Sequence, residues 1–364
     1  MAGEGITDPS RVGLRGAGAG LTAGSDNNEL FLKKFSGEIL QSFEESNIFK
    51  PLHTIRTIES GKSAQFPVTG IASANYHTPG ENIASNGLVG AGGYLSDIAK
   101  NEKIITIDKM LVASTFLANI DDVKNHYDIR SVYANELGKA LAVRFDTALA
   151  KVFIAAARDT ANLPVQVNKT GGRLDVANND FSAPDTPGTP AAVTGAQLVA
   201  AFFTAAQKLD ENDVPSDGRF CVLPPEQYYK LITGADSSNS FSLTSAVNSD
   251  IGGQGGIASG TIPQIAGISI YKSNHIPNTD LSTTTSGDGS ASNDVFGGSG
   301  VGYNGDFQNT LGIVSHSAAV GTVKLLDLAT ESEYQIERQG TLFVAKYAMG
   351  HGVLRPECAI ELVS

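Results

Sequence analysis

The residues that could bind a nucleotide in this sequence are three glycines in its C-terminal part. Gly300, Gly302 and Gly305 match the G-x-G-x-x-G pattern that cradles dinucleotide phosphates. That pattern works only between a strand and a helix, because the backbone amides must surround the phosphate. Here the glycines follow a Gly/Ser-rich stretch, and no clear helical pattern comes after them. The sequence therefore predicts no nucleotide site and no cofactor.

The histidines and carboxylates do not form a catalytic or metal-binding pattern either. No two of the six histidines stand four residues apart on a predicted helix, as zinc ligands often do: His53, His77, His126, His275, His316 and His351. His351, between Gly350 and Gly352, could act as an acid or base, but a structural role in a tight turn is the favoured interpretation. The side chains of Asp121 and Asp122 are adjacent and point apart. We therefore predict no catalytic residue and no metal site.

The cysteine content and the net charge exclude further classes. Cys221 and Cys358 are too far apart to suggest a disulfide framework or a metal site. The 364 residues carry 26 Lys and Arg against 38 Asp and Glu, a net charge of −12, which disfavours general binding to nucleic-acid phosphates. No apolar run of about 18 residues predicts a membrane span, and the first residues lack the order of a signal peptide. We expect a soluble protein made in a cytoplasm, with two subdomains.

One long helix is the strongest structural prediction. Over residues 128–160 the apolar side chains recur every fourth residue, at Tyr133, Leu137, Leu141, Phe145 and Leu149. No proline interrupts the pattern, and Asp128 is suited to cap its start. At 1.5 Å per residue, such a helix is roughly 45 Å long. This length fits an extended subunit with a central strut better than a compact domain.

The N-terminal region predicts two arms. Residues 1–25 are rich in Gly, Ala and Ser, and a short amphipathic helix follows up to about Glu45, after the capping pair Asp26 and Glu29. Residues 52–70 and 101–112 are rich in strand-forming residues and flank about 30 loop-like residues. We interpret them as a long hairpin, which needs a neighbouring molecule for stability because isolated two-stranded hairpins are marginal.

The rest of the sequence, from residue 162 onward, predicts a mixed α/β region and a C-terminal set of strands. Residues 162–194 look like a loop, and after it we expect helices over residues 195–209 and 226–232, with strands over 219–223 and 265–273. The tail predicts a hairpin of residues 331–338 and 341–349 that turns at Gln339 and Gly340, then a last strand over 359–363, all beside the long helix.

Several longer blocks resemble one known family. They are SGKSAQFP at 60–67, Tyr76, PGEN at 79–82, EKIITID at 102–108, NHYDIRS at 125–131, AVGTVKL at 319–325 and AKYAMGHGVLRPE at 345–357. In this order they resemble the major capsid proteins of T7-like short-tailed bacteriophages, including those of cyanobacteria. The blocks bracket nearly the whole chain, whereas residues 160–315 match mainly in layout.

The resemblance implies an α+β fold of the Hong Kong 97 capsid type. Residues 1–52 would then form an N-terminal arm, and residues 53–112 an extended hairpin that overlaps a neighbouring subunit. The peripheral subdomain would comprise residues 113–194 and 316–364, with helix 128–160 as its spine. The axial subdomain would comprise residues 195–315 and crowd the five- and six-fold axes of a shell.

The resemblance also implies a structural protein and not an enzyme. Pentamers and hexamers of the chain would build an icosahedral shell around double-stranded DNA, without reading its sequence and without a membrane. The shell would assemble in the bacterial host cytoplasm with a scaffolding protein and a portal protein, expand on maturation, and become part of the virion. The expected contacts between subunits involve Lys62, Phe66, Tyr76, Glu81, Asn82, Tyr94 and Arg355.

Two alternatives remain open at this point. An encapsulin-like nanocompartment shares the fold but encloses protein cargo instead of DNA. A hydrolase or ligand-binding protein with long lid loops would be a monomer or a small oligomer.

Overall fold

The computed structural model describes residues 47–69, 74, 76–77, 79–80, 83, 100–107, 110–124, 129–159, 169–181, 193–233, 264–281 and 303–364. The chain divides into two units. The first unit comprises Met1–Asn47, Met110–Phe145 and Leu326–Ala348, and the second comprises Ile48–Lys109, Asp146–Leu325 and Met349–Ser364. The predicted N-terminal helix, up to about Glu45, lies outside the described residues.

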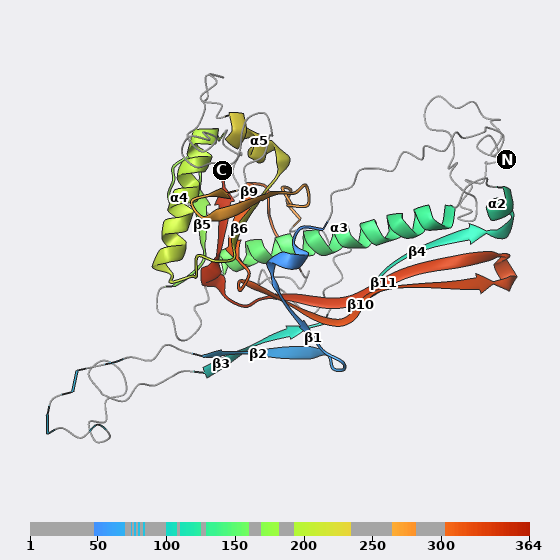
Figure 1. Ribbon diagram of the computed structural model, residues 1–364, viewed down its shortest axis with the longest axis horizontal. Helices are drawn as coiled ribbons and strands as arrows, with labels where there is room; N and C mark the ends of the chain where they lie inside the picture. Colours follow the sequence, from blue (N-terminus) through green and yellow to red (C-terminus); the bar gives the residue numbers. More distant parts are fainter. Residues whose placement is uncertain are drawn as a thin grey trace. The chain divides into compact units, whose positions relative to one another are not determined.

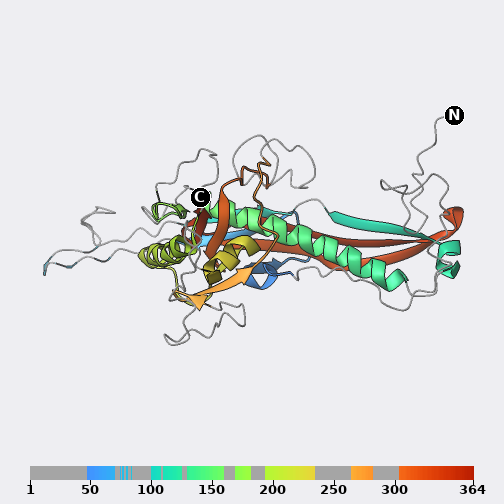
Figure 2. The same cartoon turned by 90° about the horizontal axis from the view of Figure 1, so that it is seen from above.

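The predicted long helix is present as α3, Ile129–Arg158 (Figure 1, Figure 2). In the first unit it buries Leu141 and Phe145, as the four-residue repeat predicts. In the second unit it is buried on every side, since all residues from 149 to 157 are at most 3% exposed. Even Lys151 is buried there, and its Nζ donates to Asn304 Oδ1 at 3.0 Å. The C-terminal part of α3 is therefore a core element and not an amphipathic surface helix.

A four-stranded sheet has the order β1-β10-β11-β4. Its strands are β1 Thr54–Thr57, β10 Val320–Gln335, β11 Gly340–Val353 and β4 Leu111–Ala118. In the first unit β4 pairs antiparallel with β11, from Gly340 opposite Ala118 to Tyr347 opposite Leu111. In the second unit β1 runs parallel to β10, with Thr54 opposite Gly321.

The turn between β10 and β11 is longer than expected. We predicted a strand up to Arg338, but β10 ends at Gln335 and a 3₁₀ turn, η4 Ile336–Arg338, follows. Gln339 then adopts a left-handed conformation, with φ of 49°. The short helix α2, Asn119–Lys124, starts beside this turn, because the Asn119 amide donates to Gln339 O at 2.9 Å.

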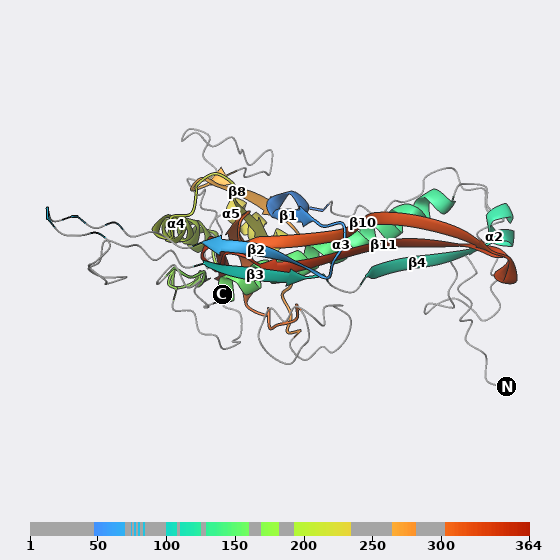
Figure 3. The ribbon, with the colours of Figure 1, turned by 90° about the horizontal axis from the view of Figure 1, so that it is seen from below.

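The predicted hairpin is present as the two-stranded sheet β2–β3 (Figure 3). β2, Ser63–Thr69, pairs antiparallel with β3, Lys100–Thr106, from Ser63 opposite Thr106 to Thr69 opposite Lys100. The prediction of one extended run over residues 101–112 is wrong. That run splits into β3 and β4, which pair in different sheets.

A six-stranded sheet in the second unit has the order β5-β12-β9-β6-β8-β7 (Figure 1). These strands are β5 Gly172–Asp175, β12 Ala359–Val363, β9 Thr310–His316, β6 Arg219–Leu223, β8 Ile268–Lys272 and β7 Gln264–Ile265. Helices α4, Gly195–Glu211, and α5, Pro225–Thr233, lie beside the sheet. Thr194 and Gln197 form a capping box that starts α4. Two 3₁₀ turns, η1 Lys50–Leu52 and η5 Pro356–Cys358, complete the described elements.

The order of this sheet corrects two expectations from the sequence. β5 lies within residues 162–194, which we expected to be loop. β12 contacts the last residue of α3 through Glu361, as expected, but it pairs with β9 and β5 and does not join the strands of the C-terminal hairpin in one sheet. The expected subdomain boundary between residues 315 and 316 falls within β9. Strand pairing between segments far apart in sequence decides these positions, and local patterns do not report it.

Candidate subunit-contact site

Three of the residues expected at subunit contacts lie in the described part of the extended hairpin, and they have different surroundings. Tyr76 is fully exposed, and Lys62 is also exposed. Lys62 lies in the turn before β2, and its backbone carbonyl accepts a hydrogen bond from Ile107 N at 2.8 Å. Phe66 is half-buried, and the guanidinium of Arg56 lies 5.6 Å from its ring centroid. Phe66 is therefore partly engaged within its own chain.

The other expected contact residues divide between the C-terminal block and the undescribed part of the hairpin. Arg355 is exposed just after β11, and its backbone amide donates to Ala319 O at 3.2 Å. Glu81, Asn82 and Tyr94 lie outside the described residues. Among the described residues, the structure does not bring Lys62, Tyr76 and Arg355 into one contact cluster.

The base of the hairpin packs on the body of the second unit through a small apolar cluster. Ala64 of β2 and Ile105 of β3 are buried against Val323 and Leu354. Ile58, Phe66 and Ile107 are partly buried around this cluster. Burial of an aliphatic side chain such as Ile105 contributes about 1.5–3 kcal/mol. The hairpin is thus anchored at its base, while Tyr76 and Ile83 in its distal part are exposed.

Three glycines make room for this anchor. A Cβ at Gly350 would overlap the carbonyl oxygen of Thr106, the last residue of β3. A Cβ at Gly352 would lie 2.8 Å from Ile105 Cγ1, and one at Gly321 would lie 2.7 Å from Leu354 Cδ1. We call Gly321, Gly350 and Gly352 the glycine seat. The sequence shows the G-H-G triplet at 350–352, but not that another strand crosses it.

His351, between two of these glycines, is buried in a polar cluster. Its Nδ1 lies 2.8 Å from Thr322 Oγ1, its backbone amide donates to Tyr303 Oη at 3.0 Å, and Tyr303 Oη donates to the His351 carbonyl at 3.2 Å. Burial, with a further contribution from nearby His53, lowers the pKa of His351 to about 3. A neutral, 3% exposed imidazole cannot reach a substrate, which agrees with the structural interpretation of this residue.

Because the pKa of His351 is lowered, we expect the folded chain to lose stability in acid. The variant His351→Asn should lose less. The folded state binds the proton only near pH 3, whereas an unfolded histidine binds it near pH 6.5. Stability from His351 is therefore complete above about pH 6.5 and decreases by up to about 1.4 kcal/mol per pH unit below it. Denaturant unfolding of the full chain between pH 7 and 5 should show a shallower loss in His351→Asn. Equal pH slopes for the two proteins would contradict this assignment.

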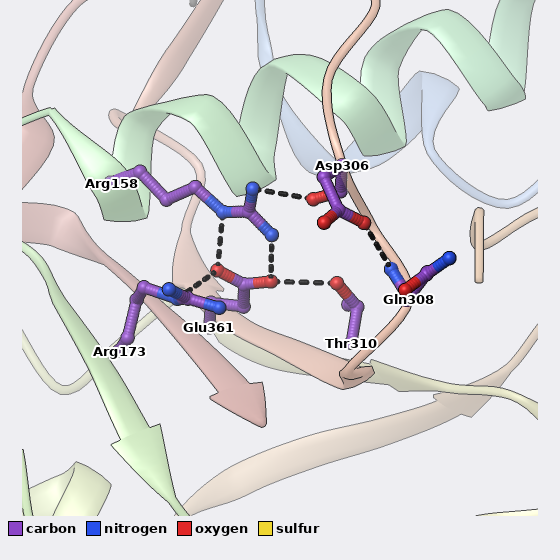
Figure 4. A network of polar contacts seen from close by, with 6 residues as sticks. All are labelled: Arg158, Arg173, Asp306, Gln308, Thr310 and Glu361. Atoms are coloured by element: carbon purple, nitrogen blue, oxygen red, sulfur yellow. Dashed lines mark hydrogen bonds and ion pairs between the residues drawn. The ribbon is translucent and has the colours of Figure 1, made fainter. Parts of the chain in front are cut away.

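A buried ion-pair network connects the helix and sheet of the second unit (Figure 4). Glu361 of β12 is 0% exposed and accepts two hydrogen bonds from Arg158, the last residue of α3, at 2.7 and 2.6 Å. Arg173 Nε of β5 lies 3.2 Å from Glu361 Oε2, and Thr310 Oγ1 of β9 donates to Oε1 at 2.6 Å. Arg158 also donates to the Asp306 carbonyl at 2.6 Å. One carboxylate thus fixes α3 against β5, β9 and β12.

The first residues of the second unit are also fixed on α3. The Ile48 amide donates to Asp146 Oδ2 of α3 at 2.9 Å, and His275 Nδ1 lies 3.2 Å from the same oxygen. Phe49 is fully buried, with its ring centroid 5.9 Å from that of Phe153. These contacts hold the start of the described chain on α3.

The described residues contain no cluster of three or more His, Cys, Asp or Glu side chains suited to a metal ion. Cys221 and Cys358 are both buried, and burial raises the pKa of the Cys358 thiol to about 12. Within the same described part, no helix is long and apolar enough to cross a membrane. The features that the structure does present are an anchored hairpin, a buried core and exposed apolar side chains.

Comparison with known proteins gives one consistent result. A family model described as Gp10A-like, major capsid protein, matches residues 65–363. The major capsid protein of Escherichia phage T7 is 33% identical over 352 residues, which cover 95% of this chain and 95% of that protein. The capsid structure of the cyanophage P-SCSP1u is 38% identical with a TM-score of 0.73, over 94% of this chain and 95% of that one.

A more distant structure agrees on the fold. The mature capsid subunit of bacteriophage PhiM1 is 17% identical but has a TM-score of 0.67 over 94% of both chains. The fold is thus the Hong Kong 97 type that the sequence blocks predicted. With a family match that spans most of its length, this chain belongs to the Gp10A-like family of phage major capsid proteins.

Proposed function

We propose that this chain builds the icosahedral shell of a double-stranded DNA phage, and that its extended hairpin overlaps a neighbouring copy. The observation that carries the proposal is the contrast within the hairpin. Its base is buried on the glycine seat of its own subunit, whereas Tyr76 and Ile83 further along are exposed. Exposed apolar side chains on an extended arm are stabilised when another molecule covers them. Identical copies closed by symmetry would supply that cover.

The assignment of subdomains follows the same proposal. Residues 1–52 act as the N-terminal arm, residues 113–194 and 316–364 as the peripheral subdomain, and residues 195–315 as the axial subdomain. Tyr76, Lys62 and Arg355 are then contact residues between copies. In support, all three side chains are exposed in the single chain.

The partners we propose are a scaffolding protein during assembly in the host cytoplasm, a portal protein and the enclosed DNA. The chain acts as a structural protein and not as an enzyme. Its net charge of −12 suits a container that does not bind the DNA backbone tightly. Expansion of the shell requires that the subunits pack in two ways that differ little in free energy. The glycine seat at the base of the hairpin is a candidate hinge for that change.

Deletion of residues 83–93, at the tip of the hairpin, tests the arm directly. We expect a folded subunit that makes no stable shells, because the anchor at Ala64 and Ile105 remains while the reach to the neighbour is lost. Circular dichroism would report folding, and sedimentation with electron microscopy would report shells. Normal, heat-stable particles from the deletion variant would refute the proposed role of the arm. A gradient assay for nuclease-protected DNA in particles would distinguish a genome shell from a protein-filled compartment.

A further inference from the structure

Asn304 and Gly305 form a pair of neighbours in which an asparagine can lose its side-chain amino group. The backbone nitrogen of the residue after an asparagine can attack the side-chain Cγ, close a cyclic imide and expel ammonia. Glycine permits this attack best, because it has no Cβ to block the approach or to restrict the backbone. The sequence contains the pair twice, at Asn86–Gly87 and at Asn304–Gly305. Only the second pair lies in the described part of the chain.

The side-chain oxygen of Asn304 faces a buried ammonium group. Lys151 of α3 is 2% exposed, and its Nζ donates to Asn304 Oδ1 at 3.0 Å. Because an ammonium group can only donate, the amide atom that faces it must be the oxygen and not the nitrogen. During the attack by Gly305 N, negative charge develops on this same oxygen. A fixed donor about 2.7–3.1 Å from such an oxygen stabilises the transition state. Lys151 is thus placed to accelerate the reaction.

The attacking nitrogen, Gly305 N, is not held in a hydrogen bond. Among the described residues it donates to no acceptor, whereas the Gly305 carbonyl accepts from Leu281 N at 3.0 Å. An amide that donated to another carbonyl would have to break that bond before it could turn toward Asn304. Asn304 itself is half-buried, so water, which the second step of the reaction consumes, can reach its side chain.

The residues on both sides of the pair are fixed in the second unit. Before the pair, Tyr303 is buried, and its Oη bonds the amide and the carbonyl of His351 at 3.0 and 3.2 Å. After the pair, the Asp306 carbonyl accepts from Arg158 of α3 at 2.6 Å (Figure 4). Reacting groups that the fold already holds together need not lose further entropy to meet. The segment therefore keeps the asparagine amide beside α3.

We propose that Asn304 is a site of spontaneous deamidation that Lys151 accelerates. Gly305 N bonds to Asn304 Cγ, the Cγ–Nδ2 bond breaks, and Nδ2 leaves as ammonia with the proton of Gly305 N. Water then opens the imide and leaves an aspartate or an isoaspartate, so each conversion adds one negative charge beside the lysine. Lys151 keeps its own protons and stabilises the oxygen. The reaction needs no enzyme, oxidant or second subunit, so the inference does not depend on the proposed function.

Incubation of the purified full chain at mildly alkaline pH, followed by peptide mass spectrometry, tests the proposal. Residue 304 should gain the mass difference between a hydroxyl and an amino group, with isoaspartate among the products. Lys151→Met should convert about tenfold more slowly, because it removes the donor to the oxygen. Lys230→Met, which removes a lysine of α5 that pairs with Glu226, is the matched control and should convert at the unaltered rate. Equal rates in Lys151→Met and in the unaltered chain would overturn the proposal.

A comparison without any variant decides the matter even if Lys151→Met does not fold. In concentrated urea both Asn–Gly pairs lose their surroundings, so Asn86 and Asn304 should convert at similar rates. In the native chain, Asn304 should convert about tenfold faster than it does in urea, because the donor is in place and the segment is fixed. Conversion of Asn304 that is no faster in the native chain than in urea would show that the fold does not promote the reaction, and the proposal would be wrong.

Discussion

Glu361→Gln should lower the free energy of unfolding by about 3–5 kcal/mol, the usual cost of removing one partner from a buried ion pair. The carboxylate is completely buried, and it accepts hydrogen bonds from Arg158 and Thr310 while it pairs with Arg173. Glutamine has nearly the same shape, so the variant leaves two mostly buried guanidinium groups without their counter-charge. Because native proteins are stable by only about 5–15 kcal/mol, this loss is a large share of the total. Denaturant unfolding of the unassembled subunit measures it.

The matched control for this variant is Glu226→Gln on α5. Glu226 pairs with Lys230 at 2.7 Å, but its side chain is 73% exposed. Exposed pairs of this kind typically contribute about 0.3–0.5 kcal/mol. A similar small change in both variants would show that the network around Glu361 is not a structural support of the second unit.

Gly350→Val should loosen the hairpin base and reduce the shell yield tenfold or more. Its Cβ would overlap Thr106 O, so β3 must move away from the glycine seat. Overpacking at such a site typically costs about 1–3 kcal/mol, which the second unit can absorb without unfolding. Hydrogen exchange should become faster in β2 and β3 but remain slow in β6. Sedimentation of the assembled particles reports the loss of shells.

Gly138→Ala is the control for the glycine variant. Gly138 lies inside α3, and a Cβ there meets nothing within 4 Å. Alanine should therefore stabilise the helix by about 0.5–1 kcal/mol and leave assembly unchanged. Gly350→Val particles in normal yield, with unchanged exchange in β3, would contradict the role given to the seat.

The sequence predicts correctly those elements whose pattern depends only on residues close together in the chain. The four-residue repeat from Tyr133 to Leu149 predicts α3 within two residues at each end. The apolar run Arg219–Leu223 and the last strand Ala359–Val363 are also where the patterns predict them. In these segments the burial of apolar side chains and the intrinsic propensity agree, so tertiary contacts do not change the outcome.

Other features of the structure depend on contacts that sequence patterns do not contain. Glu361 looks like an ordinary strand carboxylate, and only its pairing with Arg158, 203 positions away, explains its burial. The glycine seat acquires its meaning from β3, which crosses it from a distant part of the chain. From the sequence alone, Ile120 and Val123 would be predicted to form a buried pair on one face of a helix, but in the structure both are exposed. Recognition of the family came from long blocks of similar residues and not from these local patterns.

Electron microscopy of the full chain, expressed together with the proposed scaffolding protein, tests the central claim most directly. The account predicts closed shells of regular icosahedral outline, built from many copies of this subunit. A preparation in which the folded chain remains a monomer or a small oligomer, with no closed particles under assembly conditions, would contradict it.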